Sequence, residues 1–371
     1  MRILFSTVPV LGHFLPMTPL VDAARQAGHE VAVASGSELE LEVKRLGVEF
    51  WPAGPDFPAM AAMPKTVLPE TASPAERIAV AVTEMFVPAA RDRASDLVRR
   101  ALDWHPNLVV HEPTELAGAI AAEAAGARHV VHGLGVWPDD IWSLFAPGYA
   151  SLCAEWRVAD RFLAARYLDV LPRALSPVEP AGFAQVIPLR PVAPPVALEG
   201  VAMPRRYPDT VYLTLGTIFH DAPDVFSAVL DGLSRLPVNV VVTVGPGADP
   251  AVVGAWPPHV HVTDYVPQEL VLPHCRVAIH HGGAGSMLGA LRHGLPQLVL
   301  PRGADNFHNA TLVRAAGAGL SLAPFEVSAS AVADAVAMLL LEPGFSDAAR
   351  TIAQDIAAML SPAEVLARLT T

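Results

Sequence analysis

Lysine is almost absent from this chain of 371 residues, which holds only Lys44 and Lys65 among its 25 basic side chains. Neither lysine follows a glycine, so a phosphate-binding loop of the G-x-x-x-x-G-K type is excluded. The 37 acidic residues outnumber the basic ones and give a formal net charge of −12. Because an acidic chain without a basic run binds nucleic acid poorly, we expect no nucleic-acid partner.

Cysteine and long apolar runs are also scarce. Cys153 and Cys275 lie far apart in the sequence, which excludes a disulfide framework and a cysteine-rich metal site. The apolar stretch near 116–131 contains two charged residues, so it is not expected to span a bilayer. The apolar run at 3–11 has no small-residue cleavage site after it and is interpreted as a buried strand. We therefore expect a cytoplasmic protein with no membrane partner.

Short apolar runs alternate with helix-like segments, which predicts parallel sheets covered by helices. The expected strands are 2–7, 30–34, 48–51, 107–111, 128–132, 211–215, 238–244, 260–262, 277–280 and 297–300. The expected helices are 16–27, 38–46, 76–102, 115–125, 223–235, 268–274, 286–293, 307–316 and 328–341. The predicted fold class is α/β, with two Rossmann-like doubly wound domains that face a cleft. Ligands in such sheets bind beyond the carboxyl ends of the strands.

A proline-rich stretch divides this pattern into two halves. We expect a Rossmann-like domain at 1–190, a linker at 191–208 and a second Rossmann-like domain at 209–345. The last segment, 346–371, is predicted to be a helix that Pro362 kinks.

The strongest local motif is the run H-H-G-G-A-G-S at 280–286, between an expected strand and an expected helix. Its glycines would let the backbone approach an anion, and the helix start would supply N–H groups and a positive dipole end. A tight turn that needs glycine only for packing is the alternative. The third glycine position of G-x-G-x-x-G is occupied by Leu288, which disfavours a nicotinamide cofactor.

A histidine and a glutamate follow two strands that would be neighbours in a doubly wound sheet. His13 comes just after the first strand, and Glu112 just after the strand at 107–111. A carboxylate beside an imidazole fixes its tautomer and makes it a base for a hydroxyl group. The alternative is a structural histidine with an unrelated surface glutamate.

Three further groups suit a ligand but also have simpler explanations. The pair Asp305-Asn306 could bind sugar hydroxyls or begin the helix at 307. The run at 265–268 could contact a nucleobase or form an ordinary turn. Apolar side chains in loops could line an acceptor pocket or belong to the core: Met60, Met63, Met85, Phe86, Trp137 and Trp142.

No metal site is expected. The run that starts at His111 matches the zinc motif H-E-x-x-H only at its beginning, because Glu115 stands where the second histidine would be. The chain also has no D-x-D pair of the kind that holds a metal-bound nucleotide diphosphate.

Taken together, the motifs resemble the two-Rossmann-domain glycosyltransferases of the GT-B fold. The closest resemblance is to bacterial enzymes that glycosylate macrolide, glycopeptide and enediyne natural products. Their G-H-x-x-P opening matches 12–16, their acidic partner matches Glu112, and their phosphate loop matches 281–286. Their sugar-contacting pair matches 305–306, and the plant signature W-A-P-Q resembles 265–268. Many arginines and prolines with few lysines also suit a GC-rich bacterial genome, such as an actinomycete's.

This resemblance implies a role for each motif. The catalytic residues would be His13 and Glu112. The donor diphosphate would be bound by Thr217, His281, Gly282, Gly283, Ala284, Gly285 and Ser286. The base would be bound by Tyr265, Val266 and Gln268, and the sugar by Asp305 and Asn306. The acceptor would be bound by Met60, Met63, Met85, Phe86, Trp137 and Trp142. The first domain would bind the acceptor, the second the nucleotide sugar, and the C-terminal helix would pack back on the first domain.

One departure from the plant pattern concerns the nucleotide. Plant enzymes that use uridine diphosphate sugars carry a ribose-binding glutamate where this chain has Gly289. Its loss favours a nucleotide without the 2′-hydroxyl, so we expect a TDP-linked deoxyhexose as donor substrate and no cofactor. The expected reaction is inverting, metal-independent transfer to a hydroxyl of a small hydrophobic aglycone in antibiotic biosynthesis. A nucleotide-sugar 2-epimerase and a catalytically silent partner protein remain alternatives, and a homodimer stays open.

Overall fold

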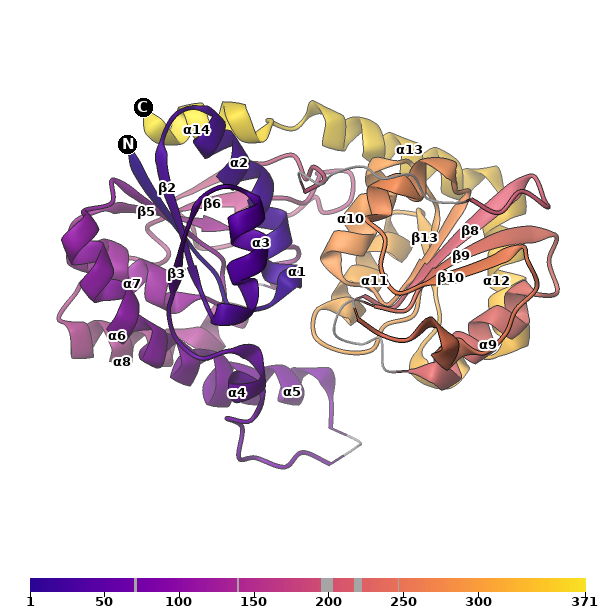
Figure 1. The fold of residues 1–371 in the computed structure, drawn as a ribbon, viewed down its shortest axis with the longest axis horizontal. Coiled ribbons are helices and arrows are strands. Elements are labelled where there is room, and N and C mark those ends of the chain that lie inside the picture. The colour runs from indigo at the N-terminus through magenta and orange to yellow at the C-terminus, as the bar shows by residue number, and fades with distance from the viewer. Residues whose placement is uncertain (70–71, 139, 195–202, 217–221, 246) are drawn as a thin grey trace. The chain divides into compact units, whose positions relative to one another are not determined.

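A computed structural model describes residues 1–69, 72–138, 140–194, 203–216, 222–245 and 247–371. The chain divides into two compact units. Unit 1 comprises Met1–Val170, Val178–Arg190 and Leu360–Thr371, and unit 2 comprises Leu171–Pro177 and Pro191–Met359. Each unit is built on one parallel sheet flanked by helices, as Figure 1 shows. The predicted pair of Rossmann-like α/β domains is thus confirmed.

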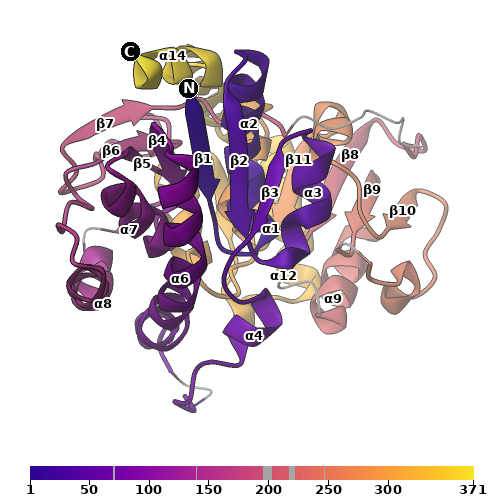
Figure 2. The same cartoon turned by 60° about the vertical axis from the view of Figure 1, so that its left-hand side comes forward.

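The sheet of unit 1 has seven strands in the order β3-β2-β1-β4-β5-β6-β7. Figure 2 shows its indigo strands β1, β2 and β3 side by side. The bounds are β1 (Arg2–Ser6), β2 (Glu30–Ser35), β3 (Glu49–Pro52), β4 (Leu108–His111), β5 (Arg128–His132), β6 (Arg166–Asp169) and β7 (Gln185–Pro188). The sequence pattern did not predict β6 and β7.

Helices cover both faces of this sheet. Leu4 belongs to the core cluster that includes residues of α6, α7 and α8, whereas Ile3 and Phe5 face the opposite side and are also buried. Burial on both faces explains why the strands read as continuous apolar runs. The helical segments are α1 (Leu11–Phe14), η1 (Leu15–Met17), α2 (Thr18–Gln26), η2 (Ser37–Leu39), α3 (Glu40–Arg45), α4 (Phe57–Ala61), α5 (Pro74–Ala81), η3 (Val82–Phe86), α6 (Val87–Trp104), α7 (Leu116–Ala125), α8 (Ile141–Trp156) and α14 (Pro362–Thr370).

The helix expected at 76–102 is three consecutive segments. Its first part, α5, begins with a capping box in which Ser73 and Glu76 bond reciprocally. The five-residue segment η3 then takes the wider π-helical form before α6 continues. A π-helical turn inside an α-helix often occurs at a functional site, and this one carries Met85 and Phe86 of the predicted acceptor pocket.

Unit 2 repeats the architecture with six strands in the order β10-β9-β8-β11-β12-β13. The strands are β8 (Asp209–Thr214), β9 (Val238–Thr243), β10 (Val260–Thr263), β11 (Val277–His280), β12 (Gln297–Val299) and β13 (Gly319–Ser321). The helical segments are α9 (Pro223–Leu233), η4 (Pro250–Val253), η5 (Gln268–Leu270), η6 (Leu272–His274), α10 (Ala284–Arg292), α11 (Asn306–Ala315), η7 (Pro324–Glu326), α12 (Ala329–Leu341) and α13 (Pro343–Ala358). The helix expected at 268–274 is therefore two short 3₁₀ turns.

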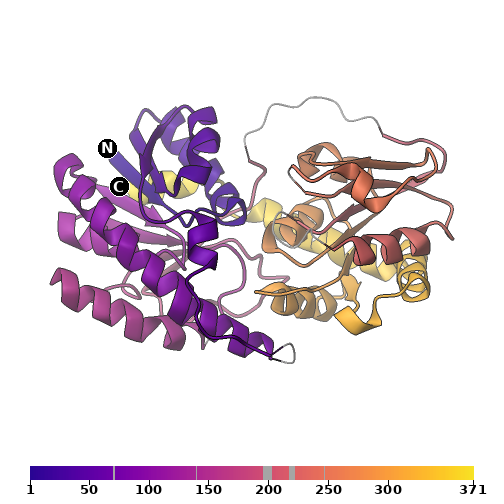
Figure 3. The ribbon, with the colours of Figure 1, turned by 60° about the horizontal axis from the view of Figure 1, so that its bottom comes forward.

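The C-terminal segment forms two helices rather than one kinked helix. The first, α13, belongs to unit 2, and the second, α14, belongs to unit 1, where it packs against α2. Ser361 caps α14 in a capping box with Glu364, and Pro362 occupies its first turn, so the proline begins a helix instead of bending one. Figures 1 and 3 both show the two chain ends close together on unit 1.

Within the described residues, no single helix is long and apolar enough to cross a membrane. The pair α12 and α13, bent by 70° at their junction, passes that test by length and composition alone.

Candidate active site

Two neighbouring strands of unit 1 bring His13 and Glu112 together. His13 lies in the short helix α1 that follows β1, and Glu112 directly follows β4. The two strands pair in parallel, with Ser6 opposite His111. The Nδ1 atom of His13 lies 3.3 Å from Oε1 of Glu112. The expected pairing of these strands is therefore what brings the two side chains within reach.

The carboxylate of Glu112 is fully buried and hydrogen-bonded. The backbone N–H of Val8 donates to Oε1 at 3.3 Å, and that of Thr114 donates to Oε2 at 2.7 Å. Burial alone would raise the pKa of Glu112. The charge of His13 and the hydrogen bonds from His13 and Thr114 outweigh burial and lower that pKa below its ordinary range. Glu112 is thus an ionised buried carboxylate, and the alternative of an unrelated surface glutamate does not describe it.

The imidazole of His13 is oriented by this carboxylate. An ionised oxygen facing Nδ1 favours the tautomer that carries its proton there, which leaves the lone pair on Nε2. The His13 side chain is 25% exposed, so its ring is only partly withdrawn from solvent. A ring held in this way can take a proton from a hydroxyl group.

Other titratable groups surround Glu112 without sharing its role. Glu115 forms an ion pair with Arg93 at 3.6 Å, and both side chains are fully buried. Burial lowers the pKa of His111 and of His132 to about 4, so both rings are neutral at pH 7. Across the described residues, no group of three or more His, Cys, Asp or Glu side chains is placed to hold a metal ion.

Four of the six predicted acceptor residues lie together near His13. Met60 is buried with Val8, which follows β1, and Met63, Met85 and Phe86 pack against the same cluster. The ring of Phe86 stacks on that of His13, with centroids 6.4 Å apart and planes 28° apart. An apolar surface therefore adjoins the imidazole.

The remaining two predicted acceptor residues lie in the aromatic core of unit 1. Trp142 stacks on Phe162 with ring centroids 4.3 Å apart, and Trp137 packs edge-on against Phe183. Both tryptophans belong to or pack against the core cluster built on α6, α7 and α8. For this pair the simpler explanation, a structural role in the core, matches the contacts.

The predicted phosphate loop lies at the end of β11 in unit 2. Met287 donates to the carbonyl of Gly283, so the N–H groups of Ala284, Gly285 and Ser286 have no acceptor within the helix. These three groups sit at the positive end of α10. The N–H of Gly282, in contrast, donates to Nδ1 of His280 at 3.0 Å, so this predicted phosphate contact is used inside the loop.

The ring of His280 is fixed in one tautomer. Because its Nδ1 accepts from Gly282, its Nε2 carries the proton and donates to Oε1 of Gln297 at 2.5 Å. The amide of Gln297 in turn donates to the carbonyl of Met287. This chain of bonds ties the loop to β12 and to the first turn of α10.

His281 fits because two glycines leave room for its ring. A Cβ atom at Gly216 would lie 2.3 Å from Cε1 of His281, and one at Gly283 would lie 2.6 Å from Nε2. Burial lowers the pKa of His281 to about 3, so the ring is neutral: it can offer a phosphate one N–H hydrogen bond but no positive charge. Thr217, the other predicted phosphate contact, lies outside the described residues.

The predicted base-binding run leads from β10 into η5. Tyr265 is 46% exposed, and Val266 is half-buried against a core cluster of unit 2. Gln268 donates from Nε2 to the carbonyl of Gly285 at 3.1 Å. Its amide occupies the space beside Gly289, where an added Cβ atom would lie 2.4 Å from Nε2. The amide therefore fills the place left by the missing glutamate of the plant pattern.

The two predicted sugar-binding residues differ in their surroundings. Asn306 is buried, and its Oδ1 accepts from the backbone N–H groups of Arg302 and Gly303. It therefore shapes its own loop, and the helix α11 begins at Asn306 with Asp305 as its N-cap position. Asp305 is only half-buried. Its Oδ2 accepts from Asn309, whose amide also donates to the carbonyl of Gly282 at 2.8 Å. Asn309, which the sequence pattern did not single out, joins the carboxylate to the phosphate loop.

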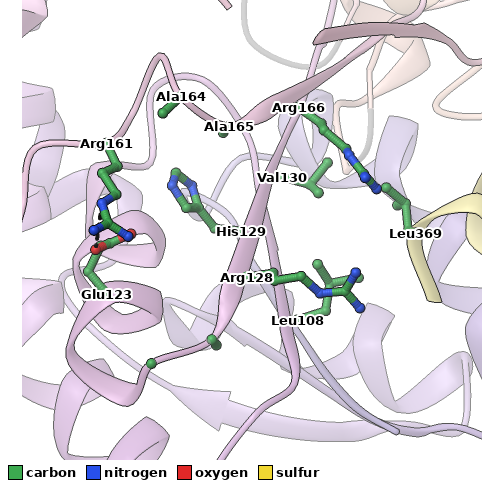
Figure 4. A pocket seen from close by; sticks show the side chains of 12 residues that line it. Leu108, Glu123, Arg128, His129, Val130, Arg161, Ala164, Ala165, Arg166 and Leu369 are labelled. Carbon is green, nitrogen blue, oxygen red and sulfur yellow. Dashed lines mark ion pairs between the residues drawn. The ribbon is translucent and has the colours of Figure 1, made fainter. Parts of the chain in front are cut away.

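A cavity of about 500 Å³ in unit 1 lies at the opposite ends of the strands from His13. Figure 4 shows it lined by Arg128, His129, Arg161 and Arg166, with Arg161 directed at Glu123. Ligands of doubly wound sheets bind at the carboxyl ends, so this cavity is separate from the candidate site.

Comparison with solved structures defines the class of protein. The glycosyltransferase SnogD from Streptomyces nogalater matches with a TM-score of 0.81 and 27% identity, over 100% of this chain and 99% of that one. The glycosyltransferase VinC in complex with dTDP matches with a TM-score of 0.81 and 26% identity, over 100% of this chain and 98% of that one. The chain is a glycosyltransferase with the GT-B fold.

Family models and sequence relatives narrow this class. The models of the erythromycin biosynthesis protein CIII-like N-terminal and C-terminal domains match residues 22–173 and 227–371. The L-demethylnoviosyl transferase of Streptomyces niveus is 36% identical, over 87% of this chain and 85% of that protein. The elloramycin glycosyltransferase of Streptomyces olivaceus is 32% identical, over 100% of this chain and 97% of that protein. The chain therefore belongs to the erythromycin biosynthesis protein CIII-like family of natural-product glycosyltransferases. These relatives lend no support to an epimerase or a silent partner.

Proposed function

We propose that this enzyme transfers a deoxyhexose from a TDP-sugar to a hydroxyl of a small hydrophobic aglycone, with inversion and without a metal ion or cofactor. The observation that carries the proposal is the pairing of His13 with the buried, ionised Glu112 beside an apolar cluster. A base next to an apolar surface suits an acceptor that is hydrophobic but carries one reactive hydroxyl.

In the proposed reaction, Nε2 of His13 takes the proton from the acceptor hydroxyl. The acceptor oxygen then forms a bond to the anomeric carbon as the bond between that carbon and the diphosphate oxygen breaks. A single displacement of this kind inverts the anomeric configuration. Glu112 stabilises the imidazolium that forms, because its charge lies 3.3 Å from Nδ1.

The leaving diphosphate would be stabilised by unit 2. Its charge grows as the glycosidic bond breaks, and the N–H groups of Ala284, Gly285 and Ser286 lie at the positive end of α10. The Ser286 hydroxyl and the neutral ring of His281 would add hydrogen bonds. Backbone N–H groups and a helix dipole would thus stabilise the negative charge that a lysine stabilises in other phosphate loops. Asp305, held by Asn309, is the proposed ligand of the sugar hydroxyls, with Asn306 shaping its loop.

The choice of TDP rests on Gly289 and its surroundings. Gly289 provides no carboxylate, and the amide of Gln268 occupies the space beside it. A 2′-hydroxyl on the ribose would therefore lack the glutamate that binds it in the plant enzymes. The related VinC was solved with dTDP, and a relative from Streptomyces peucetius is named a TDP-daunosamine transferase. Both support a thymidine nucleotide.

Donor choice is tested by measuring kcat/KM for TDP-deoxyhexoses and UDP-hexoses with a panel of polycyclic and macrolide aglycones. We expect transfer with at least one TDP-sugar and slower transfer with the matched UDP-sugar. Equal kcat/KM for the two nucleotides would refute the role assigned to Gly289. Parallel reactions with a chelator should show unchanged rates, and product NMR should show the inverted anomer.

A further inference from the structure

A threonine hydroxyl lies between the two side chains of the proposed dyad. The Oγ1 atom of Thr114 is 2.8 Å from both carboxylate oxygens of Glu112 and 3.4 Å from Nδ1 of His13. Glu115 donates its N–H to the carbonyl of Glu112, so residues 112–115 form a tight turn. Pro113 stands at the second position of this turn, which proline favours. The turn folds Thr114 back over the carboxylate two residues before it.

The number of hydrogen atoms available determines which group donates and which accepts in each contact. A hydroxyl has one hydrogen, and the ionised carboxylate of Glu112 is the strongest acceptor within reach. The hydroxyl hydrogen of Thr114 therefore points to Glu112. The lone pairs on Oγ1 remain to accept a hydrogen bond from Nδ1–H of His13.

The direct contact between the dyad partners is long for a charged pair. Charge-assisted N–H···O bonds are typically about 2.7–2.9 Å, whereas His13 Nδ1 lies 3.3 Å from Glu112. Part of the carboxylate's capacity is already used by the N–H groups of Val8 and Thr114. A carboxylate oxygen of Glu112 and the hydroxyl oxygen of Thr114 therefore both lie within reach of the Nδ1 proton of His13.

We infer that Thr114 is a positioning residue for His13: its hydroxyl is the second acceptor that fixes the ring orientation and keeps the lone pair on Nε2. This inference rests on the proposed role of His13 as base. The other charged or titratable groups near Glu112 are His111 and His132, which are neutral, and Glu115, which pairs with Arg93. Thr114 contacts both the carboxylate of Glu112 and the imidazole of His13, so it can transmit the position of the carboxylate to the ring.

The kinetic test compares Thr114→Val, which keeps the shape but removes the hydroxyl, with Thr114→Ser, which keeps the hydroxyl. The valine variant should lower kcat on the order of tenfold or more, the size expected for loss of a hydrogen bond to a charged group. KM for the acceptor should change by less than about twofold, because Thr114 acts through His13. The serine variant should restore kcat. If valine destabilises the fold, Thr114→Ala replaces it.

A spectroscopic test does not depend on turnover. In protein labelled with ¹⁵N-histidine, the His13 signals are identified by their loss in His13→Gln. Wild type and Thr114→Ser should show the Nδ1–H tautomer, and Thr114→Val should show a mixture of tautomers. If the wild-type enzyme transfers no sugar in the panel, the proposed function fails, while the tautomer comparison still decides the role of Thr114.

A matched control is Ser361→Ala. The Ser361 hydroxyl also donates to a glutamate carboxylate, that of Glu364, at 2.6 Å. It caps α14, far from His13 in the sequence, and within the described residues it forms no hydrogen bond with a histidine. It should lower the melting temperature without changing kcat or the His13 tautomer. Unchanged kcat and tautomer in Thr114→Val would overturn the inference. So would equal loss of kcat in the valine and serine variants with the wild-type tautomer, since that would indicate packing.

Discussion

The two units hold the histidines of the candidate site in opposite ways. In unit 1, His13 is partly exposed and faces an ionised carboxylate, an arrangement that favours the charged imidazolium once a proton arrives. In unit 2, His280 and His281 are buried, and burial lowers their pKa to about 4 and about 3. The same side chain is thus suited to take up a proton in one unit and to form hydrogen bonds as a neutral ring in the other.

This contrast shows that environment, not residue type, sets the chemistry of each histidine. A base needs a partner that stabilises its charged form, and Glu112 with Thr114 supplies one. A neutral donor needs a dry site that resists protonation, and the glycines around His281 allow such close packing.

The largest effect is expected from His13→Ala. Removing the proposed base should lower kcat on the order of a thousandfold, since general-base catalysis contributes roughly 10²–10⁴. The affinity for TDP, measured by calorimetry, should stay within about twofold of wild type, because the predicted phosphate loop lies in unit 2. Unchanged turnover would remove the assignment of His13 as base.

A smaller effect is expected from Gly216→Ala. The new Cβ would lie 2.3 Å from the His281 ring, and the backbone at φ +81° is unfavourable for alanine. His281 must therefore shift, and TDP binding should weaken on the order of tenfold by calorimetry.

Gly254→Ala is the matched control for Gly216→Ala. Gly254 has nearly the same φ, +82°, but nothing lies within 4 Å of an added Cβ atom. It should cost stability without changing TDP affinity. Equal weakening of TDP binding in both variants would show that backbone strain, not displacement of His281, is responsible.

The smallest effect is a pH dependence of stability. His280 and His281 stay neutral in the folded protein down to about pH 4 and pH 3, whereas unfolded histidine titrates near 6.5. Between about pH 6.5 and 4 the unfolded state therefore binds more protons, and stability falls as the pH falls. His111, His129 and His132 of unit 1 add to this effect. Calorimetry should show a melting temperature lower by about 5 °C or more at pH 5 than at pH 7.

The contribution of Glu112 to stability is lost at a lower pH than that of the buried histidines. Its pKa is lowered in the folded protein, so its stabilising contribution is present above its ordinary pKa and is lost only as the pH falls through the folded value. A melting temperature that stays flat from pH 7 to 5 would contradict the burial of neutral histidines in both units.

The sequence pattern predicted the sheets and the strand ends that carry His13, Glu112 and the glycine loop. Continuous apolar runs bounded by glycine and proline are a strong signal for buried parallel strands, and such strands bring their carboxyl ends to one edge. The strands β6 and β7 and the helix α8 were missed because the stretch at 141–188 shows no clear period. The strand β13, with three residues, was too short to recognise.

Contacts between distant residues were beyond the pattern. That Asn309 bonds both Asp305 and Gly282 depends on how α11 lies against the loop. The spacing of four residues between Asp305, the N-cap position of α11, and Asn309 was the one local signal that could have suggested this pair. The close approach of Gly216 to the His281 ring likewise depends on packing between distant residues. So does the position of Trp137 and Trp142 in the core.

The chain passes back to unit 1 at its end, because α14 packs against α2 while α13 belongs to unit 2. A chimera made with a relative by one crossover near residue 190 would therefore pair α2 of one parent with α14 of the other. Exchange of the whole first unit requires residues 360–371 to travel with the N-terminal segment. Recombination of the first unit within this family therefore needs two crossovers, and the last dozen residues must come from the parent that supplies His13.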